Sequence, residues 1–150
     1  MVTLGLAGVL AAVSVPVFLE SSGRNHAWAT SELIGAQIRQ SRLKAISQNT
    51  TFQVRFNCPG TGQFRSLVMT GNAATDNAVT RCGSTTKYDS GVQKVAPGVS
   101  FGTVPTIQVN GRGVVSVIGG AVPLTISVAY GNSTRTLTVS ATGQITFSSN

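Results

Sequence analysis

Side chains that could perform acid–base, nucleophilic or metal chemistry are scarce in this sequence. Among its 150 residues there are four acids, one histidine and two cysteines. They are Glu20, Glu32, Asp76, Asp89, His26, Cys58 and Cys82. General acid–base catalysis needs paired carboxylates or a histidine with an orienting partner. His26 and Glu32 do not have the i+3 or i+4 spacing that brings helical side chains together, and the two aspartates lie in loop-like sequence. We therefore expect no enzyme, no metal site, no cofactor and no small-molecule substrate.

The net charge favours anionic partners but does not identify which one. Charged residues make up 10% of the chain, against roughly 25% in an average soluble domain. The formal net charge is nevertheless +7. Such an excess attracts nucleic acid or anionic lipid headgroups. Because the basic residues are scattered from Arg24 to Arg135, a solvated basic surface explains them equally well.

Residues 1–19 form an apolar segment without a charged side chain. A membrane-spanning helix needs about 20 apolar residues. A cleaved signal peptide would open with Lys or Arg, and a buried helix of a soluble domain would show a polar stripe; the segment has neither. Its glycines and alanines allow close packing between helices. We expect a helix that stays in the membrane or among sister subunits. The contact residues would be Leu4, Leu6, Val9, Leu10, Val13, Val17 and Phe18.

A second helical segment follows the apolar one. Residues 24–47 contain no proline and carry an apolar stripe at close to helical spacing. The stripe consists of Ala27, Ile34, Ile38 and Ala45. Pro16 removes a backbone hydrogen bond, which predicts a bend in the first segment. Residues 21–23, Ser-Ser-Gly, predict a soft joint between the two.

The remaining sequence predicts a β-rich head. Residues 52–57 alternate strictly between apolar and polar side chains, as in a half-buried strand. Further strands are predicted at 64–69, 99–101, 106–109, 114–118, 124–130, 134–139 and 144–147. Gly131-Asn132 and Thr142-Gly143 are turn sequences. Short strands after one long helix predict an α+β fold with an antiparallel sheet. The expected organisation is a membrane or filament-core half-helix at 1–22, an amphipathic half-helix at 23–48 and a head at 49–150.

An apolar helix with an interior proline that runs on into an amphipathic helix resembles the stalk of type IV pilins and type II secretion pseudopilins. Residues 13–18, Val-Ser-Val-Pro-Val-Phe, match the end of that stalk's apolar part. Residues 31–49 resemble the GspH/FimT branch, whose helix carries Leu-Arg-x-Ala-Arg-x-x-Ala. Arg42 and Ala45 match this motif, and Ser41 replaces its alanine. Residues 107–113 and 134–145 resemble the strands of the same branch, whereas residues 60–97 do not.

The start of the chain departs from the family pattern. Those families have a short basic leader that ends in glycine, followed by a mature start of the Phe-Thr-Leu-Ile-Glu kind. The leader, the processing glycine and the early glutamate are not visible around Met1. Counting back from Pro16, we expect several mature residues to precede Met1 in the native protein.

The resemblance implies a compartment and a set of partners. The chain would cross the bacterial inner membrane once, with its head in the periplasm, and enter a periplasmic or extracellular filament with other pilin or pseudopilin subunits. That compartment is oxidising, which favours a disulfide between Cys58 and Cys82 over a shared metal ion. The disulfide would close loop 58–82 and stabilise the head by roughly 3 kcal/mol.

The function implied by the resemblance is structural, that of a minor pilin or pseudopilin that assembles through its N-terminal helix. Two alternatives stay open. Some FimT-like members capture DNA for natural transformation with a Gly-Arg-x-Arg tail, which reads Gly-Gln-Ile-Thr at residues 143–146 here. The remaining candidates for contacts to DNA are Arg112, Arg135 and Lys94. Loop 58–82 would alternatively make the chain an adhesive tip subunit.

Overall fold

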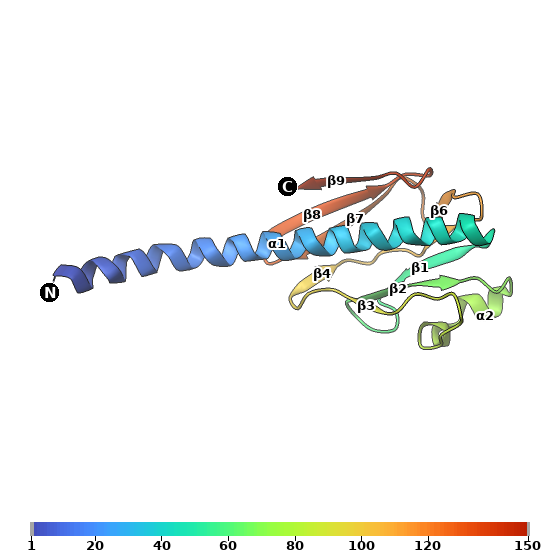
Figure 1. Cartoon of the computed structure of the whole chain (residues 1–150), viewed down its shortest axis with the longest axis horizontal. Coiled ribbons are helices and arrows are strands. Elements are labelled where there is room, and N and C mark those ends of the chain that lie inside the picture. The colour runs from blue at the N-terminus through green and yellow to red at the C-terminus, as the bar shows by residue number, and fades with distance from the viewer. Residues whose placement is uncertain (1, 150) are drawn as a thin grey trace.

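The computed structural model describes the backbone of residues 2–149 and the side chains of residues 24–148. One long helix, α1 (Val2–Gln48), carries a β-rich head along its C-terminal half. Its N-terminal half extends past the head as a rod (Figure 1). This arrangement confirms the predicted α+β fold with a long N-terminal helix.

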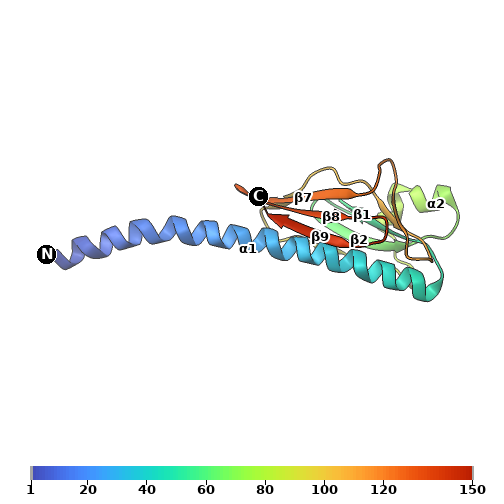
Figure 2. The same cartoon turned by 90° about the horizontal axis from the view of Figure 1, so that it is seen from above.

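The helix α1 continues through Pro16 and through residues 21–23. Figure 2 shows a gentle curve along the helix. The predicted soft joint therefore does not interrupt the helix. A single glycine costs a helix only about 1 kcal/mol relative to alanine, which is too little to break it between long helical flanks.

The C-terminal half of α1 docks on the head through the predicted stripe, whose four residues are all buried. Gly35 lies in the same face, and a Cβ atom there would come within 3.0 Å of the Phe147 ring. The helix ends where Asn49 adopts a left-handed conformation with φ of 47°. The Thr50 amide then donates to the Ala45 carbonyl and the Asn49 amide to the Ile46 carbonyl, a C-terminal capping motif that satisfies the last carbonyls.

The head contains two antiparallel sheets within the described backbone, where the sequence predicted one. The first has the order β3-β2-β1-β5-β6 and the second the order β4-β7-β8-β9. The first consists of β1 (Phe52–Phe56), β2 (Gln63–Val68), β3 (Gln93–Lys94), β5 (Ile107–Val109) and β6 (Val115–Val117). The second consists of β4 (Val99–Phe101), β7 (Leu124–Tyr130), β8 (Ser133–Val139) and β9 (Ile145–Ser149). The division into two sheets depends on long-range pairing, which alternation along the chain does not encode.

The two sheets and α1 share one hydrophobic core. The helix contributes Ile34 and Ile38, the first sheet Phe52 and Phe64, and the second sheet Leu137 among others. Tyr130 pairs with Ser133 across the Gly131-Asn132 turn, which confirms the predicted hairpin. The core therefore fixes the helix against both sheets at once.

The middle of the chain has more regular structure than the sequence predicted. A short helix, α2 (Ala73–Asn77), is followed by a 3₁₀ turn, η1 (Val79–Cys82), before the chain reaches β3. The Asn72 side chain caps α2 by accepting hydrogen bonds from the amides of Ala74 and Thr75. Loop 58–82 is thus folded, and its short helix α2 lies at the end of the head farthest from the rod (Figure 1).

Candidate functional site

The side chains predicted to contact the membrane or the filament core lie outside the described part of the structure. Leu4, Leu6, Val9, Leu10, Val13, Val17 and Phe18, together with Pro16, lie outside the described side chains, although all of them are in α1. In the part of the chain with described side chains, no helix combines the length and the apolar character needed to cross a membrane.

Arg42, the arginine that matches the family motif, ties the helix to both sheets. Its Nε donates to the Gly113 carbonyl at 3.0 Å, in the turn between β5 and β6. A Cβ atom at Gly143, in the turn between β8 and β9, would come within 2.7 Å of Arg42 Cδ. Both glycines have positive φ, 77° and 75°. The Arg42 side chain is therefore held between two turns. Both turns need glycine, because the backbone has positive φ there and a Cβ atom would crowd Arg42.

Gly143→Ala should lower the free energy of unfolding by about 1–2 kcal/mol through its left-handed backbone and by about 1–3 kcal/mol more by displacing Arg42. Gly119→Ala is the matched control, because Gly119 has the same φ of 75° and no atom within 4 Å of its Cβ position. Urea unfolding of the full chain in mild detergent measures both variants. Equal losses would mean that Arg42 moves aside at no cost.

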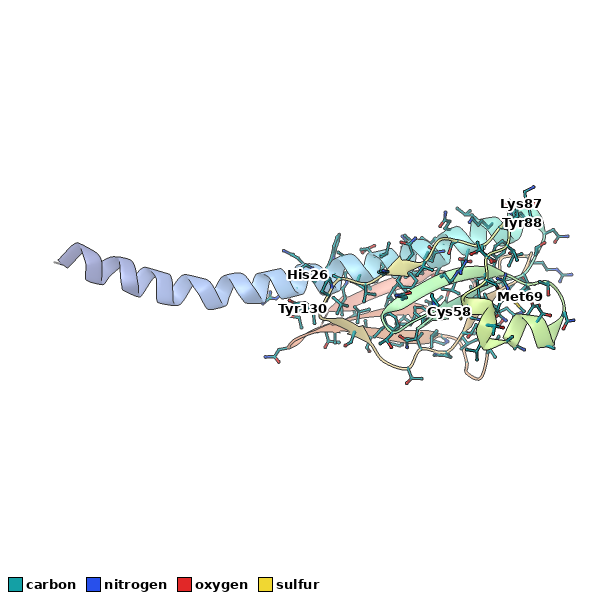
Figure 3. The ribbon with its side chains drawn as sticks, turned by 90° about the horizontal axis from the view of Figure 1, so that it is seen from below. His26, Cys58, Met69, Lys87, Tyr88 and Tyr130 are labelled. Atoms are coloured by element: carbon teal, nitrogen blue, oxygen red, sulfur yellow. A yellow bond between two sulfur atoms is a disulfide. The ribbon has the colours of Figure 1, made fainter. Side chains whose placement is uncertain are left out.

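The structure joins Cys58 and Cys82 in the predicted disulfide, and none of the described cysteines is unpaired. Cys58 is buried, two residues after β1, and Cys82 ends η1. Figure 3 labels Cys58 within the head, away from the rod. The disulfide thus attaches the folded middle segment to the first sheet.

Three buried arginines hold the same segment, and sequence reasoning missed all of them. Arg65 donates to the carbonyls of Cys82, Ser84 and Ser90. Arg55 donates to the carbonyls of Asp76 and Ala78. The third, Arg81, is 4% exposed and forms a two-pronged ion pair with Asp89, at 2.7 and 2.8 Å. Their partners are mostly backbone carbonyls many residues away, so no local pattern marks these arginines.

The ion pair of Asp89 sets the electrostatics of this segment. The carboxylate has no exposed surface (0%) and also accepts from the amides of Val68 and Thr86. Burial is the largest single influence and opposes ionisation, but the hydrogen bonds from Arg81, Thr86 and Val68 together hold the pKa of Asp89 below its usual value. The bond to Asp89 raises the pKa of Arg81. Burial, with the charge of Arg81, lowers the pKa of Arg55.

A cavity of about 440 Å³ lies between α2 and η1. It is lined by Ala74, Thr75, Ala78, Thr80, Arg81 and Ser84. Apart from Arg81, its walls carry only methyl groups, hydroxyls and backbone. Because Asp89 neutralises Arg81, the cavity offers no uncompensated charge to a ligand.

The remaining candidate residues are dispersed. Arg112 lies in the β5–β6 turn near the C-terminal end of α1, whereas Arg135 in β8 pairs with Glu32 at 3.5 Å. The helix rises about 15 Å between Glu32 and Arg42, so Arg112 and Arg135 lie at different levels along the helix axis. Lys94 is on β3, at an edge of the first sheet. The structure does not bring the three predicted DNA contacts together.

Among the described side chains, no carboxylate forms an ion pair with the single histidine. The His26 ring packs on Tyr130 with centroids 5.2 Å apart, where the rod joins the head (Figure 3). Glu32 is occupied by Arg135. Within the described residues, no group of His, Cys, Asp and Glu could hold a metal ion.

Comparison with solved structures supports the fold. No protein-family model matches the chain, and no curated protein matches it in sequence. Similar solved structures include the minor pseudopilin EpsH from the type 2 secretion system of Vibrio cholerae. It has a TM-score of 0.57 and 14% identity, over 83% of this chain and 97% of EpsH. The type IV minor pilin FimU of Pseudomonas aeruginosa gives a TM-score of 0.55 and 14% identity, over 83% of this chain and 90% of FimU. The chain therefore has the fold of minor pilins and pseudopilins.

Proposed function

We propose that the chain is a structural subunit of a type IV pilus or a type II secretion system, a minor pilin or pseudopilin that assembles through the N-terminal half of α1. The observation that carries this proposal is the single helix, which docks on the head with one half and extends past it with the other (Figure 1). The extending half contains the apolar residues 1–19. Both structural neighbours are pilin-type subunits, which agrees with a role other than catalysis.

The energetics of the rod require a partner. Burial of a Val, Leu or Phe side chain is favourable by about 1.5–3 kcal/mol. The head cannot provide this burial for residues that extend beyond it. Before assembly the partner is the inner membrane, which the chain crosses once with its head in the periplasm. After assembly the partners are the rods of neighbouring subunits, which small side chains such as those of Gly5, Ala7 and Gly8 allow to approach closely.

The test is flotation of the full-length chain with vesicles of phosphatidylethanolamine and phosphatidylglycerol. The chain should float with the vesicles and need detergent for solubility in their absence. Leu10→Asp should lower membrane partitioning on the order of 100-fold, because an acid at the centre of a spanning helix costs about 2.5–3.5 kcal/mol.

Ser116→Asp is the matched control, since Ser116 is an exposed residue of β6, and it should float like the wild type. A wild-type chain that stays monomeric in buffer without detergent or vesicles would contradict the proposal.

DNA binding and adhesion have less support. The three basic candidates for DNA contacts lie on separate strands and turns of the two sheets, so the structure does not gather them into one basic cluster. The cavity at α2 and η1 is the observation that favours an adhesive tip, and its lining carries no aromatic platform for a sugar. The subunit role therefore remains the function that the structure supports best.

A further inference from the structure

The outer face of α1 near its C-terminal end is apolar at its centre and basic at its edges. Leu43 is 67% exposed and Ile46 is 45% exposed. Arg39 is exposed one turn before Leu43. Ile46 lies against Gly113, which places the exposed Arg112 beside the same face. We name these four residues, Arg39, Leu43, Ile46 and Arg112, the outer face of α1.

The positive charges of this face have no nearby negative charge, because every described acidic side chain already has a partner elsewhere in the chain. Asp89 pairs with Arg81. Asp76 is buried and accepts hydrogen bonds from Thr70 and Gly71. Glu32 pairs with Arg135, about 10 Å along the helix from Arg39. No acidic side chain among the described residues is left to offset Arg39 and Arg112 at the surface.

We propose that the outer face of α1 binds the head of a different pilin-type subunit, one that presents an acidic rim around an apolar centre. This inference rests on the proposed function and deepens it, because it names the partner. A second copy of this chain presents the same basic groups, and like charges across an interface oppose its formation. Two copies of this chain would therefore repel each other if their outer faces met, whereas an unlike subunit with an acidic rim would be attracted.

The apolar centre favours a protein over nucleic acid. Phosphates are bound by basic and polar groups and by backbone amides, and the outer face presents two large aliphatic side chains between its arginines. Interfaces between proteins instead combine an apolar centre with a polar rim. Neighbouring exposed aliphatic side chains with a polar rim fit a site of protein contact better than a site for phosphate.

The experiment uses a charge-reversed copy of the full chain as the acidic partner. Leu43→Cys is introduced into the otherwise unchanged chain and into a copy that also carries Arg39→Glu and Arg112→Glu, and both are placed in phosphatidylcholine vesicles. Disulfide cross-linking between unchanged and reversed copies should exceed cross-linking between unchanged copies by about tenfold or more at low salt. The excess should shrink as salt screens the charges.

Thr125→Cys, on the exposed surface of β7, is the matched control and should show no preference for the reversed copy. Arg39→Gln with Arg112→Gln should give intermediate cross-linking, which keeps the test valid where the reversed copy folds poorly. Equal cross-linking of unchanged and reversed copies overturns the inference. So does a shift of duplex DNA by the unchanged chain that the reversed copy loses. Failure of flotation would instead refute the proposed function itself.

Discussion

Asp89→Ala is expected to lower the free energy of unfolding by about 3–5 kcal/mol, the usual cost of removing one partner of a buried ion pair. The substitution leaves the Arg81 guanidinium buried at 4% exposure. It also leaves the amides of Val68 and Thr86 without the carboxylate that they contact at 2.8 and 2.7 Å. Urea unfolding of the full chain in mild detergent, followed by circular dichroism, measures the loss.

Lys87→Gln is the control for a nearby change of charge, because Lys87 is exposed on the same segment, and it should leave stability unchanged. The pH dependence of the free energy of unfolding shows whether the loss of stability comes from the Asp89 carboxylate. The folded state lowers the pKa of Asp89, so its contribution is complete above the unfolded value of about 3.9 and is lost as pH falls through the folded value. Asp89→Ala should lack this acid-dependent loss. A variant as stable as the wild type would show that the ion pair only balances its own desolvation.

Replacing both cysteines, Cys58→Ser with Cys82→Ser, should lower the free energy of unfolding by roughly 3 kcal/mol. The disulfide spans a sequence separation of 24, and opening it enlarges the unfolded ensemble while the buried arginines still hold the folded segment. The wild type unfolded under reducing conditions should match the double variant.

The dependence of the unfolding free energy on denaturant concentration shows whether removing the disulfide changes the unfolded chain. A steeper slope in the double variant would show that its unfolded chain exposes more surface than the cross-linked one. An unchanged midpoint together with an unchanged slope would contradict the prediction. Asp89 and Cys82 stabilise the same segment. The losses of unfolding free energy caused by Asp89→Ala and by the cysteine replacements are therefore not expected to add up when the variants are combined.

The sequence predicted the elements of the fold better than their assembly. Helical spacing marked the docking stripe of α1, and alternation marked most strands, because both patterns depend on neighbours along the chain. The division into two sheets depends on pairings such as that of Phe52 with Val109, which no local pattern records. The short helix α2 is capped by one asparagine side chain, and nothing in the sequence distinguishes this cap from an ordinary loop residue.

The candidate site shows the same limit. Arg42 was recognisable because it matches a family motif, and the pairing of Cys58 with Cys82 because the chain has two cysteines. Arg81 and Asp89 looked like surface charges, since they lie in a stretch rich in Gly, Ser and Thr. Their burial follows from the way the chain folds back over β2, so it became visible only in three dimensions.

The uninterrupted course of α1 has a mechanical consequence. A helix of 47 residues is about 70 Å long at 1.5 Å per residue, and it reaches from the tip of the rod to the far end of the head without a hinge. Torque applied to the rod is therefore passed directly to the head, which cannot swivel on its own. In the filament proposed above, the packing of the rods would dictate which way each head points around the filament axis, and tension along that axis would be shared between the helix and the sheets fastened to it.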